Sequence, residues 1–162
     1  MKIKGEKIHQ VFKKTIVIPD PETGEPVMVF VAQACNFSED LEKIIKEPQP
    51  PYFRKAGQTQ AVKEVDNPQY LEEMKEYEEV RFAYMILRTL EATPDLEWET
   101  IDMADPTTYK NYRIELQEAG LTDSMINLLI LKILGVHNIS PERIDEATQR
   151  FLSGQAQAKF DN

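Results

Sequence analysis

His9, His137 and Cys35 carry the side chains of this sequence best suited to nucleophilic catalysis or metal binding. A nucleophilic cysteine needs a base beside it, and neither histidine is near Cys35 in the sequence, although folding can bring them together. The spacing matches neither an HExxH nor a CxxC metal motif. We expect a solvated or capping His137 and a small buried Cys35. The sequence therefore predicts no metal site and no nucleophile.

Five carboxylates fall within eleven residues, at Asp95, Glu97, Glu99, Asp102 and Asp105. Acid–base catalysis needs two carboxyls whose environments separate their pKa values inside a cleft, whereas this segment is polar and predicts ordinary solvated groups. The turn sequence DPETGE lacks the ligand spacing of a calcium loop, and no phosphate-binding glycine motif occurs. We expect no catalytic residue, no cofactor, no metal and no small-molecule substrate.

Charge is distributed unevenly along the 162 residues. The 28 Asp and Glu outnumber the 19 Lys and Arg, which gives −9, yet residues 1–18 carry +4 and the remainder −13. An acidic body repels nucleic acid and anionic lipid. The longest apolar stretch, 125–135, is about half of a membrane span. With one cysteine, no internal disulfide forms and a reducing compartment is the simplest setting. These features predict a cytoplasmic protein that binds neither nucleic acid nor a membrane.

The first 46 residues predict a β-hairpin followed by a short helix. Two β-branched runs, at 15–18 and 27–32, flank a turn rich in Pro, Asp and Gly. The alternating apolar residues of the second run predict that both faces are covered. Because an isolated two-stranded hairpin is marginal in water, we expect it to pack on helices or to pair with another strand, of this or another protomer. Ser38 caps a helix over 39–46. Residues 47–66 are polar and Pro-rich, and they predict a linker.

Residues 67–152 predict a helical domain. Asn67-Pro68 begins a helix to about residue 91, and Asp105-Pro106 begins another that Gly120 ends. Thr122 caps a helix over 123–134 that is apolar nearly all round and is therefore predicted to be central. Ser140-Pro141 opens the last helix, and residues 153–162 predict a flexible tail. The predicted buried face of that last helix consists of Ile144, Ala147, Thr148 and Phe151. The fold class is α+β, a hairpin followed by a bundle of about four helices.

Tyr70, Met74 and Tyr77 form a stripe among glutamates in the first half of the helix that begins at Asn67. Tyrosine offers rigid contact area and methionine adapts its shape, so the stripe is a candidate partner-binding face. The alternative is that the three residues cover the core of this chain.

Four segments carry a resemblance to a known family. They are 47–58 (EPQPPYFRKAGQ), 66–102, 105–134 and the helix ending in RFLSGQA at 150–156, preceded by a basic start leading to a hairpin. Together they resemble the tail assembly chaperones of tailed bacteriophages. The likeness covers most of the chain, and its motifs are helix starts and core stripes.

The resemblance implies a function in the host cytoplasm. Such chaperones coat the long tape-measure protein until tail-tube subunits polymerise around it, tend to self-associate, and are typically absent from the virion. They carry no known catalytic residue. Two alternatives stay open. One is a virion component of the tail, neck or baseplate, whose hairpin extends a neighbour's sheet. The other is a regulatory binding module or an unrecognised enzyme.

Overall fold

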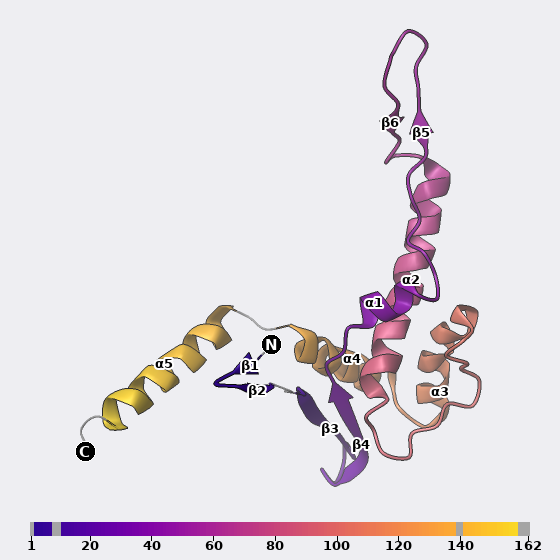
Figure 1. Ribbon diagram of the computed structural model, residues 1–162. Helices are drawn as coiled ribbons and strands as arrows, with labels where there is room; N and C mark the ends of the chain where they lie inside the picture. The colour runs from indigo at the N-terminus through magenta and orange to yellow at the C-terminus, as the bar shows by residue number, and fades with distance from the viewer. Residues whose placement is uncertain (1, 8–10, 139–140, 159–162) are drawn as a thin grey trace.

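The computed structural model describes residues 2–7, 11–138 and 141–158, and it confirms the predicted α+β class. A body holds the central elements, an arm formed by α2 and the β5–β6 hairpin projects from it, and α5 extends in another direction (Figure 1). The strands are β1 (Lys2–Ile3), β2 (Glu6–Lys7), β3 (Lys13–Pro19), β4 (Pro26–Gln33), β5 (Tyr52–Phe53) and β6 (Val62–Lys63). The helices are α1 (Phe37–Glu42), α2 (Pro68–Leu90), the 3-10 helix η1 (Pro106–Asn111), α3 (Tyr112–Glu118), α4 (Asp123–His137) and α5 (Pro141–Ala158).

The predicted hairpin is the antiparallel pair β3–β4. Its turn is held by Asp20, whose carboxylate accepts the amides of Glu22 and Thr23 at 2.8 and 2.9 Å. One face is buried, through Ile16, Ile18, Phe30 and Ala32. The opposite face is exposed at Val17, Val27 and Val29, so the prediction that both faces are covered is wrong for this chain. The hairpin therefore keeps one apolar face outside the core.

A single cluster of buried side chains joins the hairpin to the helices. It includes Leu41 of α1, the second half of α2, Tyr109 and Leu116 from η1 and α3, and one face of α4. The Thr93 hydroxyl, just after α2, accepts the Val31 amide of β4 at 2.9 Å and lies 3.3 Å from the Val31 carbonyl oxygen. The strands and helix before residue 47 and the helices after residue 66 therefore share one core.

Three predicted helix starts are confirmed by their caps, at Asn67, Asp105 and Thr122. The predicted cap Ser38 is wrong, because α1 begins at Phe37 after Asn36, so that Ser38 lies inside the helix, and it ends at Glu42 instead of residue 46. The Asn67 side chain accepts the amides of Gln69 and Tyr70, and Thr122 accepts the amide of Met125. Asp105 caps a first turn that is 3-10 rather than α-helical. Gly120 has φ +97°, which is the left-handed geometry that a helix stop requires. These three starts depend on neighbours within a few residues, which is why the sequence could predict them.

Two predictions about helix packing are wrong. The helix α4 is not surrounded, because Leu128 and Leu131 are 45% and 65% exposed. The predicted buried face of α5 is also exposed, as is every described side chain of that helix. Periodicity identifies an apolar face without saying what covers it. The helix α5 continues to Ala158, into the predicted flexible tail, whereas Ser140 and residues 159–162 lie outside the described residues.

The predicted linker contains a small hairpin. The strands β5 and β6 pair Tyr52 with Lys63 and Phe53 with Val62, and Gly57 turns the chain at φ +86°. Tyr, Phe and Val favour strands, and a left-handed glycine between them is the signal that a composition-based reading of 47–66 as linker overlooked. The β1–β2 pair, with its turn at Lys4 and Gly5, was likewise not predicted.

Candidate functional site

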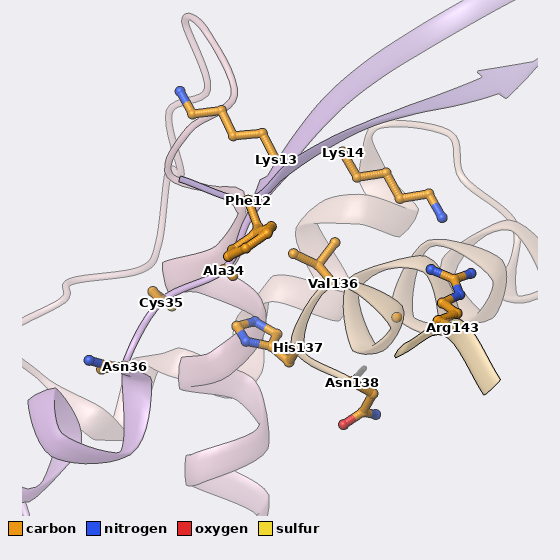
Figure 2. A pocket seen from close by; sticks show the side chains of 11 residues that line it. Phe12, Lys13, Lys14, Ala34, Cys35, Asn36, Val136, His137, Asn138 and Arg143 are labelled. Atoms are coloured by element: carbon orange, nitrogen blue, oxygen red, sulfur yellow. The ribbon is translucent and has the colours of Figure 1, made fainter. Parts of the chain in front are cut away.

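Cys35 and His137, which lie far apart in the sequence, line the same pocket of about 740 Å³. Figure 2 shows both side chains with Phe12 and the basic side chains of Lys13, Lys14 and Arg143 around the opening. The start of β3, the segment between β4 and α1, the end of α4 and Arg143 of α5 supply the walls. His9, the other candidate, lies outside the described residues. The fold therefore produces the proximity that the sequence left open.

The geometry of His137 is that of a packed ring. The helix α4 continues through Gly135, so His137 lies in its last turn instead of in a solvated loop. The ring packs edge-on against Phe37, with centroids 5.3 Å apart. The Thr89 hydroxyl donates to the Met85 carbonyl at 2.7 Å, so Nε2 of His137, also 2.7 Å away, must be the donor to that hydroxyl. Burial lowers the pKa of His137 and favours the neutral ring.

The environment of Cys35 does not activate it. Burial raises the pKa of the thiol, and the opposing influence of Thr89 and Arg88 is smaller. A thiol with a raised pKa is a poor nucleophile, and Nε2 of His137 is already engaged with Thr89. The chemistry that this pocket best supports is electrostatic attraction of an anionic group by its basic rim.

Titration of His137 gives a pH prediction. Because its folded pKa lies below 6.5, the unfolded chain binds the extra proton, and this contribution reduces stability as the pH falls below about 6.5. We expect His137→Gln to flatten the dependence of unfolding free energy on pH between 7.5 and 5.5, by less than about 1 kcal/mol because the ring is partly exposed. Urea unfolding at both pH values measures it. The prediction would be contradicted if the unfolding free energy of the variant and that of the native protein changed equally between the two pH values.

Two of the five carboxylates between residues 95 and 105 bind backbone amides, and the other three, Asp95, Glu97 and Glu99, belong to exposed residues. Asp102 accepts the amide of Ala104, and Asp105 accepts the amide and hydroxyl of Thr107, which lower the pKa of Asp105. Glu115 reaches back from α3 to accept the amides of Glu99 and Thr100. Among the described residues, no three His, Cys, Asp or Glu side chains are placed to share a metal ion.

Two residues of the predicted stripe Tyr70, Met74 and Tyr77 pack against the chain itself. Tyr77 is 9% exposed and belongs to the buried cluster, Met74 packs against that cluster, and Tyr70 is half-buried. Tyr70 and Met74 keep some accessible surface, whereas Tyr77 offers a partner almost none. The alternative, that the stripe covers this chain's core, is the better description of Tyr77.

The exposed apolar side chains of the arm lie elsewhere, on the β5–β6 hairpin and the adjoining turn of α2. Figure 1 shows this hairpin beside the start of α2. We call this set the arm surface. Tyr52 is 65% exposed, with the ammonium of Lys63 5.7 Å from its ring centroid. The helix α2 joins the buried cluster at Tyr77, so its first nine residues, about 14 Å, project from the body and carry the arm surface. Its members are Tyr52, Phe53, Val62, Val65 and Leu71.

No family model, curated protein or solved structure matches this chain. The surfaces of this chain are therefore the basis for proposing its function. Among the described residues, no single helix is long and apolar enough to span a membrane. Only α4 and α5 together, across a 56° bend, reach that length and hydropathy.

Proposed function

We propose that this chain is a non-catalytic phage tail assembly chaperone, which binds the tape-measure protein and keeps it soluble in the host cytoplasm during tail assembly. The observation that carries the proposal is the arm surface, a set of exposed aromatic and aliphatic side chains held away from the body of an acidic protein. The resemblance of segments 47–58 and 66–102, which together form most of the arm, adds to it.

The arm surface would be complementary to apolar stripes on a tape-measure protein. A long helical tape measure exposes apolar stripes, and Tyr52 and Phe53 are the rigid aromatic anchors that such stripes accommodate. Many bound copies with a net charge of −9 each would keep the complex soluble by mutual repulsion. The arm lets a partner segment bind without a clash with the body.

Co-expression with the tape-measure protein of the same phage tests the proposal. We expect a soluble complex with many copies of this chain per tape measure, measured by size exclusion and quantification of both chains. The double variant Tyr52→Ser with Phe53→Ser should reduce the soluble tape measure by roughly tenfold, since two anchors are lost.

Phe12→Ser is the matched control, because Phe12 is similarly exposed but lies on the body near the pocket. It should leave the yield of soluble complex unchanged. A tape measure that stays insoluble with the native chain, or equal yields from the arm variant and the control, would contradict the proposal.

A second candidate, a component of the virion, is favoured by the exposed outer face of β3–β4, with Val17, Val27 and Val29. A strand from a neighbour would extend the sheet at its edge, and apolar side chains of that neighbour would pack on this face. Mass spectrometry of purified particles separates the two functions, since a chaperone is absent from the particle and a component is present in stoichiometric amount.

A further inference from the structure

The helix α5 has an apolar face that no described part of this chain covers. Ile144, Ala147, Thr148, Phe151 and Leu152 share one side at helical spacing, and all are exposed, Phe151 by 63%. The Thr148 hydroxyl donates to the Ile144 carbonyl at 2.8 Å, so the face holds no unpaired hydroxyl. A lone helix of 18 residues is marginal in water, and packing supplies most of its stability.

A second uncovered face lies on α4. Ile126, Leu129 and Ile133 point into the core, whereas Leu128, Leu131 and Gly135 lie on the opposite side of the helix and are exposed. We call these three residues the α4 outer face. A helix that is apolar nearly all round is normally buried all round. The body of one chain covers only half of α4, which indicates a further contact.

We propose that the apolar face of α5 from one copy packs on the α4 outer face of a second copy, and that the exchange is reciprocal. The 56° bend between the two helices directs α5 away from its own α4, as Figure 1 shows. Leu131 and Phe151 of one chain are therefore both exposed, although only twenty residues separate them. A reciprocal exchange closes at two copies with twofold symmetry.

The dimensions of the two faces agree. At 1.5 Å per residue, Leu128 to Gly135 spans about 10 Å and Ile144 to Leu152 about 12 Å. The exposed parts of Leu128, Leu131, Ile144, Phe151 and Leu152, counted on both copies, amount to roughly 1,000 Å² of surface removed from water. That area reaches the lower limit of a specific interface.

The charges select an antiparallel arrangement. Antiparallel packing brings Lys132, beside the α4 outer face, next to Asp145 on the corresponding edge of α5. Parallel packing would instead bring Lys132 toward Arg150. The inferred partner is thus a second copy of this chain with its α5 antiparallel to α4.

Light scattering coupled to size exclusion tests the inference on the full chain. We expect a mass of about twice 18.7 kDa. Phe151→Asp and Leu131→Asp should each weaken association by roughly a hundredfold, since each would bury a carboxylate at the interface, and both should keep the helical content of the body. Leu71→Asp, an equally exposed leucine on the arm, is the matched control and should remain dimeric.

A charge exchange tests the direction. Lys132→Asp should raise the dissociation constant by about fivefold, and adding Asp145→Lys should restore it. A monomeric native chain, a dimer that persists in Phe151→Asp, or tighter association of Lys132→Asp would each overturn the inference. The tape measure does not enter this experiment and the arm enters only through the control variant, so its failure is separate from failure of the proposed function.

Discussion

Replacing Leu129 by aspartate is expected to unfold the body. Leu129 is fully buried on the inner face of α4, within the cluster that joins the hairpin to α2 and α3. An unpaired carboxylate there costs several kcal/mol, on top of the lost leucine packing, against a total stability of about 5–15 kcal/mol for a typical domain. Thermal melting followed by circular dichroism should show no cooperative transition.

Leu131→Asp, two residues further along α4, is the control for this experiment. Its side chain points away from the core, so the variant should still melt cooperatively. Cooperative melting of Leu129→Asp at the same temperature as Leu131→Asp would show that the inner face of α4 is not core.

Truncating Tyr77 to alanine is expected to destabilise the protein by about 3–5 kcal/mol, because an almost fully buried aromatic ring leaves a cavity. A residue in a pure binding face would lose almost nothing in the unbound chain. Urea unfolding, with the midpoint and slope both fitted, measures the loss.

Tyr70→Ala supplies the comparison for Tyr77, since both belong to the same stripe but Tyr70 is only half-buried. We expect less than half of the Tyr77 effect. Small and equal losses at both positions would support the original interpretation of the stripe as a partner-binding face.

Several features that depend on interactions between neighbouring residues could be predicted from the sequence. Asn67, Thr122 and Gly120 identify helix ends, because caps and left-handed stops involve neighbours within a few residues. The α+β class and the β3–β4 hairpin follow from similar patterns of strand and turn residues. The end of α4 was placed too early because Gly135 was taken as its stop, whereas the glycine continues the helix to His137.

These local signals could not predict contacts between residues that are far apart in the sequence. Cys35 and His137 line the same pocket because of how α4 lies against the hairpin, and no spacing in the sequence predicts that arrangement. The apolar stripe of α5 was correctly recognised as apolar but assigned a cover that this chain does not provide. The pairing of β5 with β6 was hidden by short strands in a polar, Pro-rich segment.

The hydroxyl of Thr93 affects which edge of the β3–β4 sheet can pair with a further strand. It engages both the amide and the carbonyl of Val31, so an incoming strand would have to displace it to pair along that part of β4. Among the described residues, no backbone group outside the hairpin bonds to Thr15 or Val17 on the β3 edge. The β4 edge is therefore closed to a further strand at Val31, whereas the β3 edge opposite it offers its backbone groups to a partner.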